Sequence, residues 1–360
     1  MSSITVPKGR GASSNASGRY EKNRQEGFDD GWTGDDEPAA PLRTSLTPER
    51  AKKIITRNDS PDVGFDRSIN PYRGCEHGCI YCYARPAHAW MGLSPGLDFE
   101  SKLFFKPEGP RLLEQELCAR RYVCKPIHIG GNTDPYQPVE REHRVTRGLI
   151  EVLARFNHPF SIITKSALIA RDADIMGPMA EKGLVRAAVS ITTLDRQLAR
   201  AMEPRAATPA KRLEAISRLT DVGVPVTVGF APVIPGLNDH ELEAVLEAAK
   251  KAGATDAMYV TLRLPLEIKD LFREWLAEAR PDRAKRIMSL IRQTRGGRDY
   301  DPDWSQRMKG TGPVAELIAT RFRTAVKRYH LDGPRPALDV SQFRVPPEAR
   351  SQLDLFDLAG

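Results

Sequence analysis

The sequence predicts an α/β fold, in which a mostly parallel sheet covered by helices forms a partial (βα)6 TIM-like barrel with disordered N-terminal and C-terminal tails. Between residues 66 and 295, short apolar runs alternate with amphipathic stretches. This alternation is typical of right-handed βα crossovers and a parallel sheet. About six such units are present, fewer than the eight of a closed barrel. We expect the reactive groups at the carboxyl ends of the strands.

The expected strands are apolar runs bounded by polar or glycine-containing segments. The first is expected around residues 68–72, before a cysteine-rich loop. The other five are expected at 127–131, 160–165, 185–192, 224–233 and 257–264.

The expected helices are amphipathic stretches between and after these strands. Leu213, Ile216 and Leu219 recur at helical spacing in one of them. Asn238 followed three residues later by Glu241 predicts a capping box at the start of another. The helices are expected at 139–156, 169–182, 208–222, 238–252 and 267–279.

Four segments follow from the composition along the chain. Residues 1–45 are rich in Gly, Ser and charged residues without periodicity, which predicts a disordered tail. Residues 46–300 are expected to form the barrel core, and 301–332 a helical extension. The proline-interrupted residues 333–360 are expected to form a flexible tail.

The overall composition excludes some classes of protein. Hydrophobic residues make up 40% of the 360 residues, enough for a sizeable core. No apolar run approaches 18 residues, so no membrane span is expected. The first residues lack the apolar core of a secretory signal, so we expect a cytoplasmic protein. The net charge of +7 permits a polyanionic partner without requiring one.

Three of the five cysteines, Cys75, Cys79 and Cys82, lie on one short loop with the spacing C-x3-C-x2-C. An odd number of cysteines in a cytoplasmic chain argues against a disulfide framework. Thiolates bind iron–sulfur clusters, and a [4Fe–4S] cluster normally takes four protein ligands. Three ligands from one loop leave one iron open to an exogenous chelator, as in a reactive rather than a closed site.

Two other interpretations of this loop remain. The three thiols with His77 or His88 would make a Cys3His zinc site, although no second cysteine pair follows at zinc-ribbon spacing. Alternatively, the cysteines are unrelated core thiols, although the surrounding sequence is polar and rich in glycine.

The cysteine spacing, with Tyr81 as the aromatic residue before the third cysteine, resembles the motif of the radical S-adenosylmethionine superfamily. A longer resemblance, over about residues 65–300, is to its spore photoproduct lyase-like, or DNA repair photolyase-like, branch. The resemblance implies that the three cysteines bind [4Fe–4S] and that S-adenosyl-L-methionine chelates the fourth iron. Reduction would then give methionine and a 5′-deoxyadenosyl radical, with a flavodoxin- or ferredoxin-type protein as the expected reductant.

The end of the second strand is a candidate cosubstrate site. Gly130 and Gly131 allow the backbone to approach a ligand closely. The resembled superfamily has a Gly-Gly-Glu element here that binds the methionyl amine. This sequence has Asn132 instead of Glu, so the amine is expected to bind to backbone carbonyls, Thr133 or Asp134. The alternative is a simple turn.

Other strand ends supply further candidates. Lys165 is placed to pair with the methionyl carboxylate, and the resembled branch has a lysine here; the alternative is a solvated lysine. Ser190 and Thr192 are expected to bind the ribose hydroxyls. Val233 lies in an element that resembles the family's adenine-binding segment, although core packing alone explains an apolar residue there.

Glu203, Arg205 and Arg263 are the candidates on the substrate side, and a surface ion pair is the alternative for the first two. Spore photoproduct lyase uses a cysteine at the end of its second strand as hydrogen donor, and this chain has two glycines there. Cys118 and Cys124 precede that strand and are expected to be ordinary thiols. We therefore expect a lesion or modification other than spore photoproduct.

The last residues contain the sequence Gln-Leu-Asp-Leu-Phe, which resembles the peptide by which bacterial polymerases and repair proteins bind the replication sliding clamp. A flexible tether would present its apolar side chains to a groove. The alternative is a segment that caps its own core. The residues expected to bind are Gln352, Leu353, Leu355 and Phe356.

The leading hypothesis is an enzyme of lyase or repair type that acts on damaged or modified nucleic acid, with DNA favoured. A base in a duplex would have to be extruded. Alternatives are an RNA-modifying or other radical enzyme, and a non-catalytic zinc or iron–sulfur module that binds nucleic acid. The basic residues considered for steering phosphates are Arg85, Arg120, Arg121 and Lys125, and the alternative for each is an ordinary surface residue.

Overall fold

The computed structural model describes residues 9–21, 42–333, 335 and 337–349. Its main sheet has seven strands in the order β10-β9-β8-β7-β6-β3-β2, and every adjacent pair from β10 to β3 is parallel. This confirms the predicted partial barrel of six parallel strands. The parallel strands are β3 (Arg67–Ile69), β6 (Ile127–Ile129), β7 (Phe160–Thr164), β8 (Val185–Ser190), β9 (Val226–Val233) and β10 (Asp256–Thr261), and β2 (Ile55–Arg57) joins β3 antiparallel at the edge.

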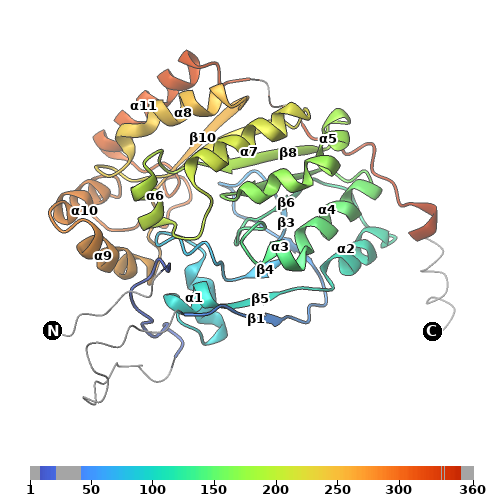
Figure 1. Ribbon diagram of the computed structural model, residues 1–360, viewed down its shortest axis with the longest axis horizontal. Coiled ribbons are helices and arrows are strands. Elements are labelled where there is room, and N and C mark those ends of the chain that lie inside the picture. The colour runs from blue at the N-terminus through green and yellow to red at the C-terminus, as the bar shows by residue number, and fades with distance from the viewer. Residues whose placement is uncertain (1–8, 22–41, 334, 336, 350–360) are drawn as a thin grey trace.

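Helices cover the outer side of this sheet (Figure 1). Each buries one stripe of apolar residues; in α8, for example, Leu242, Val245, Leu246 and Ala249 recur at helical spacing and are buried. None of the described helices is long and apolar enough to cross a membrane. The covering helices are α2 (Gly109–Cys118), α4 (Val145–Arg155), α5 (Ala173–Glu181), α7 (Pro209–Asp221), α8 (Leu242–Lys251) and α11 (Gly312–Arg328).

A small second sheet, which the sequence did not predict, lies beside the cysteine loop. Its order is β1-β5-β4, with β1 (Ser45–Pro48), β5 (Lys102–Phe105) and β4 (Tyr72–Arg73). The 3-10 helix η1 (Arg85–Met91) and the short helix α1 (Leu97–Ser101) complete this layer below the main sheet in Figure 1.

A separate apolar cluster supports the cysteine loop from another side. It contains Cys79 and Tyr81 from the loop together with side chains of three helices, including Met202, Phe272 and Ile287. The helices are α6 (Arg196–Met202), α9 (Ile268–Ala279) and α10 (Ala284–Gln293).

Three expected helices are divided in the structure, and the one at 238–252 begins as the 3-10 helix η3 (Asp239–Glu241) before α8. The one at 139–156 becomes α3 (Glu140–His143) and α4, because Arg144 between them has a positive φ of 48°. The one at 169–182 begins as the 3-10 helix η2 (Ala167–Asp172) before α5.

The predicted capping box at Asn238 is wrong. The Asn238 side chain accepts a hydrogen bond from the Ile234 amide at 2.7 Å and donates one to the Thr192 carbonyl at 2.8 Å. Glu241, which belongs to the 3-10 helix η3 (Asp239–Glu241), accepts from the Leu194 amide at 2.7 Å. Both side chains therefore stabilise the loop after β8, and the Asn238 side chain makes no capping hydrogen bond to the start of its own helix.

The two terminal segments were predicted to be disordered or flexible, but their described parts are held on the core. Residues 9–21 pack on the core, with Ala12 fully buried and Arg19 paired with Glu267 at 2.8 Å. Near the other end, the Arg344 amide donates to the Phe156 carbonyl at 3.0 Å. These segments lack periodicity, yet their polar groups find partners on the core.

Candidate functional site

The cysteine loop leads from β4 to η1, with Cys75 and Cys79 buried and Cys82 partly buried. Gly78 has a φ of 66°, and a Cβ on it would come within 2.6 Å of the Glu100 carboxylate. Only glycine fits this position without displacing its neighbour.

Arg85 binds the backbone of the cysteine loop from the buried side. Its guanidinium is fully buried and donates from Nε to the Cys79 carbonyl at 2.9 Å and from Nη2 to the Gly78 carbonyl at 3.1 Å. It also pairs with the buried carboxylate of Glu100. The prediction that Arg85 steers phosphates is therefore wrong, because the side chain is used inside the protein.

The three thiols lie close enough to influence one another. Burial is the largest cause that raises the pKa of each thiol. The charge of Asp134 and then the neighbouring thiols raise the pKa of Cys75 further. Several thiolates in one buried place require a cationic centre to compensate their charge. This is the environment that an iron–sulfur cluster supplies.

The histidines of the zinc alternative are engaged elsewhere. His77 Nδ1 lies 3.3 Å from Asp134 Oδ2, and His88 Nε2 lies 2.9 Å from the Lys102 carbonyl. Across the described ranges, no group of three or more His, Cys, Asp or Glu side chains is placed to hold a single metal ion. A single tetrahedral ion draws its sulfur ligands together at about 2.3 Å from the metal, whereas a four-iron cluster keeps them further apart. The donor set thus fits a cluster better than zinc.

Tyr81 is buried beside the cysteines and anchored by a polar network. Its hydroxyl donates to Glu203, which also accepts from Thr192 Oγ1 at 2.6 Å. Arg212 pairs with the same carboxylate and donates to the Ser190 carbonyl at 3.0 Å. The ends of β8 and α6 are thereby tied to the cysteine loop.

Glu203 was expected on the substrate side, and the structure buries it. Burial opposes its charge, but Arg212 and then Lys165 outweigh burial and lower the pKa of Glu203 to about 2. Sequence reasoning missed Arg212. It lies on the buried face of α7 with Ala215, Ile216 and Leu219, so the helical periodicity was the available signal.

Lys165, directly after β7, faces the same region. Its ammonium lies 5.8 Å from the centre of the Tyr81 ring. The Asp134 carboxylate accepts hydrogen bonds from the Thr164 hydroxyl at 2.6 Å and from the Lys165 backbone amide at 2.8 Å. Although burial opposes its charge, His77 above all lowers the pKa of Asp134 to about 2. The carboxylate therefore ties β7 to the loop after β6.

The glycines after β6 occupy a tight turn. Gly130 has a φ of 92°, and a Cβ on it would come within 2.7 Å of Pro135. The carbonyl of Gly131 accepts a hydrogen bond from the Tyr83 hydroxyl. Thr133 uses its hydroxyl to donate to the Tyr72 carbonyl at 2.8 Å.

The remaining cofactor candidates are held by the backbone or by packing. The Asn132 amide donates to Asn70 Oδ1 at 2.8 Å. Ser190 and Val233 are buried at the ends of β8 and β9, and the Val233 carbonyl accepts from the Leu262 amide at 2.9 Å.

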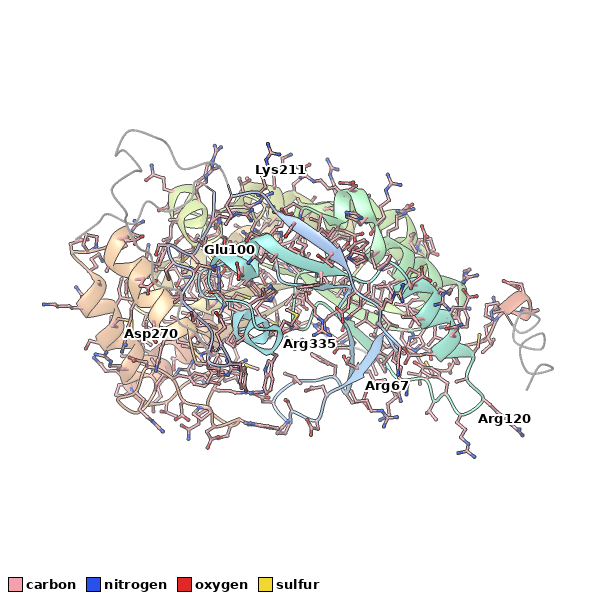
Figure 2. All side chains as sticks on the ribbon, turned by 90° about the horizontal axis from the view of Figure 1, so that it is seen from below. Arg67, Glu100, Arg120, Lys211, Asp270 and Arg335 are labelled. Atoms are coloured by element: carbon pink, nitrogen blue, oxygen red, sulfur yellow. The ribbon has the colours of Figure 1, made fainter. Side chains whose placement is uncertain are left out.

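Of the remaining candidates, Arg205 and Arg263 contact residues of the cysteine loop, whereas the others lie outside it. Arg205 forms an ion pair with Glu76 at 3.0 Å, and Lys125 pairs with Asp66 at 2.7 Å. Arg120 projects into solvent at one end of the molecule (Figure 2). Arg121 is likewise exposed, Cys118 and Cys124 are partly buried, and Arg263 stacks on Tyr83. The peptide 352–356 lies outside the described residues.

The fold is similar to that of spore photoproduct lyase. A cysteine-to-serine mutant of that enzyme superposes with a TM-score of 0.55 at 14% identity, over 79% of this chain and 78% of that one. The enzyme complexed with dinucleoside spore photoproduct gives a TM-score of 0.52 at 14% identity, over 79% of each chain.

Relatives by sequence include an uncharacterized protein of Mycobacterium tuberculosis, 34% identical over 292 residues and 80% of each chain. An uncharacterized protein of Methanocaldococcus jannaschii is 28% identical over 53% of this chain and 69% of that one.

Residues 69–249 match the family model of the radical SAM superfamily, and this range includes the cysteine loop and four of the parallel strands from β6 to β9. Members of this superfamily use a [4Fe–4S] cluster and S-adenosylmethionine, and one spore photoproduct lyase structure contains bound AdoMet. The chain therefore belongs to the radical SAM superfamily and uses these two cofactors.

Proposed function

We propose that this protein cleaves S-adenosylmethionine reductively and acts on damaged or modified nucleic acid, with DNA favoured. The observation that carries the proposal is the group of three thiols, Cys75, Cys79 and Cys82, on one short loop beside the strand ends. When bound at these thiols, a [4Fe–4S] cluster would supply the electron for reductive cleavage of the sulfonium C–S bond of S-adenosylmethionine. The three thiolates hold the cluster.

The neighbouring residues are proposed to position the cosubstrate. Lys165 pairs with the methionyl carboxylate, and the turn at Gly130–Gly131 lets the backbone approach the amine. The ring of Tyr81 shields the cluster from water, and the Glu203–Arg212 pair keeps that ring in place. Thr192 shares its hydroxyl with this pair, so its proposed contact with the ribose competes with Glu203.

Two observations support a nucleic-acid substrate. Spore photoproduct lyase, whose fold this chain shares, has been crystallised with dinucleoside spore photoproduct. The net charge of +7 also favours a polyanion. Because β6 is followed by Gly130 and Gly131 instead of a thiol, we propose a lesion or modification other than spore photoproduct.

Anaerobic turnover tests the chemistry. Reconstituted protein with dithionite is expected to convert S-adenosylmethionine into 5′-deoxyadenosine, and a variant with all three loop cysteines changed to alanine is expected to lose this activity. Cys124→Ala is the matched control, because this cysteine lies outside the loop. A colourless, zinc-loaded protein without turnover would instead support the non-catalytic module.

Nucleoside analysis tests the substrate. DNA and RNA hydrolysates from a deletion strain and its parent are compared by mass spectrometry. A lesion or modification that changes in DNA alone supports the proposal. A change in RNA alone supports the RNA-modifying alternative.

We also propose a flavodoxin- or ferredoxin-type reductant and a cytoplasmic location. The C-terminal peptide is proposed to bind the sliding clamp, which would bring the enzyme to replicating DNA. Pull-down with the clamp is expected to succeed with the full chain and to fail after deletion of residues 352–356. Equal retention of both proteins would dismiss this partner.

A further inference from the structure

We propose that Arg263, together with Tyr83, Trp304 and Arg307, binds the phosphodiester backbone of a nucleic-acid strand and stacks its bases. We call these four residues the Arg263 site. This inference rests on the proposed action on nucleic acid and names the surface that receives the strand.

Arg263 forms no ion pair with a carboxylate of the described residues, although the charge of Asp62 acts on it from nearby. Its guanidinium follows β10 and lies 5.2 Å from the centre of the Tyr83 ring. Its Nη1 has only a weak sulfur acceptor, Met308, at 3.6 Å, and its buried Nε has no hydrogen-bond partner. The nearby carboxylate of Asp62 is taken by both Nε and Nη2 of Arg307. A buried donor without a partner is costly, so the arrangement favours an added anion.

A second guanidinium lies next to Arg263. Arg295 is buried and donates to the carbonyls of Leu262 and Gln306, and its Nε also has no partner within the described ranges. Burial and then the neighbouring charge of Arg263 lower the pKa of Arg295 to about 10. An anion at Arg263 stabilises both guanidinium groups, because its attraction to each of them offsets the repulsion between them.

Two exposed aromatic rings flank these charges. Tyr83 is 47% exposed and Trp304 is 43% exposed. The Arg307 guanidinium lies 5.2 Å from the centre of the Trp304 ring and keeps that ring beside a positive charge. Exposed aromatic rings next to cationic groups bind single-stranded nucleic acid, because every base offers a face for stacking and every phosphate a charge.

The Arg263 site is continuous with the cofactor site. Tyr83 follows Cys82 directly in the chain, and its hydroxyl donates to the carbonyl of Gly131. A strand that stacks on Tyr83 therefore brings an unpaired base to the loop that holds the cluster. The other anion that could bind Arg263 is the methionyl carboxylate of S-adenosylmethionine. The cation proposed for that carboxylate is Lys165, which lies beside the buried Tyr81.

Binding of a fluorescent single-stranded DNA to the anaerobic holoenzyme tests the proposal, with salt titrations of wild type and Arg263→Gln. The glutamine variant is expected to bind about tenfold more weakly and to lower the slope of log affinity against log salt by about 1. Arg263→Lys is expected to restore the salt slope, and Trp304→Ala to weaken binding about fivefold or more through lost stacking. Arg218→Gln, at an exposed arginine of α7 paired with Glu214, is the matched control and is expected to bind as wild type does.

The outcomes separate the two proposals. If wild type binds no nucleic acid, both the proposed substrate and this site are overturned. If wild type binds and Arg263→Gln binds equally well with normal iron content, only the Arg263 site is overturned. If the variant loses affinity for S-adenosylmethionine but not for DNA, the anion is the methionyl carboxylate, and the site is again overturned.

Discussion

Arg85 and Glu100 form an ion pair with no exposed surface directly behind the cysteine loop. Glu100, labelled in Figure 2, belongs to α1. Its carboxylate also accepts the backbone amides of Gly11 at 2.8 Å and Ala12 at 2.9 Å. Arg85 donates to two carbonyls of the loop, so one chain of hydrogen bonds joins the N-terminal segment to the cysteine loop.

Removal of the Glu100 charge is expected to loosen the cluster. Glu100→Gln leaves the Arg85 guanidinium buried without a counter-charge, which costs about 3–5 kcal/mol of unfolding free energy. We expect lower iron and sulfide content per chain and a lower melting temperature. Glu108→Gln is the control, since Glu108 forms an exposed pair with Arg111. Unchanged iron content in Glu100→Gln would refute the role of this pair.

The contact between the N-terminal segment and the loop can be tested by a single methyl group. A Cβ on Gly11 would lie 1.8 Å from the carbonyl oxygen of Gly78. Gly11→Ala is therefore expected to displace the segment and to speed the loss of iron to a chelator severalfold. Gly64→Ala is the matched control, because a Cβ there has no heavy atom within 4 Å in the described structure. Equal rates of iron loss would show that the contact is dispensable.

The Glu203–Arg212 pair is expected to be strongly coupled. Arg212→Met leaves a buried carboxylate without its cation and is expected to cost about 3–5 kcal/mol in urea denaturation. The double variant Glu203→Gln with Arg212→Met is expected to recover part of this loss, because no buried charge remains unpaired. Glu214→Gln on the exposed side of α7 serves as the control and is expected to change stability little. Additive losses would contradict the coupling.

Stability is expected to fall as the pH falls from about 6.5 towards 4. His158 is buried, with Nε2 2.7 Å from the Tyr122 hydroxyl, and burial followed by the charge of Arg67 lowers its pKa to about 4. The unfolded chain binds a proton near pH 6.5 and the folded chain does not, so this stability is present above 6.5 and lost on acidification. The loss attributable to His158 is about 3 kcal/mol.

The measurement is urea denaturation at pH 7, 6, 5 and 4 for wild type and His158→Gln. The glutamine does not titrate, so its stability is expected to change less over this range, whereas His143→Gln, at a less buried histidine, is expected to follow wild type. Parallel curves for wild type and His158→Gln would rule out this histidine as the cause.

Lys165→Ala is expected to weaken S-adenosylmethionine binding about tenfold or more while iron content stays normal, because its ammonium is proposed to bind the carboxylate and not the cluster. Lys165→Arg is expected to retain part of the affinity, and Lys182→Ala, at an exposed lysine directly after α5, provides a control. Calorimetry with the anaerobic holoenzyme measures these affinities. Wild-type affinity in Lys165→Ala would dismiss the assigned partner.

The sequence by itself determined the class of fold and was enough to propose the cluster ligands. Apolar runs and helical periodicity are local signals, so β6 to β10 and α7 to α9 lie close to their expected ranges. The cysteine spacing is also local, because Cys75, Cys79 and Cys82 all lie on one short loop. The cluster site can therefore be predicted from this loop alone, without knowing which distant segments pack against it.

Only the tertiary structure decided which polar residues support that loop. Glu100 meets Gly11 and Ala12 across nearly ninety positions of sequence, and Arg212 meets Glu203 from a different helix. Pairing of this kind depends on burial and on proximity in space, which no period in the sequence records. Glu203 therefore looked like a substrate contact and proved to be an internal anchor, because the fold had already placed Arg212 and Tyr81 against it.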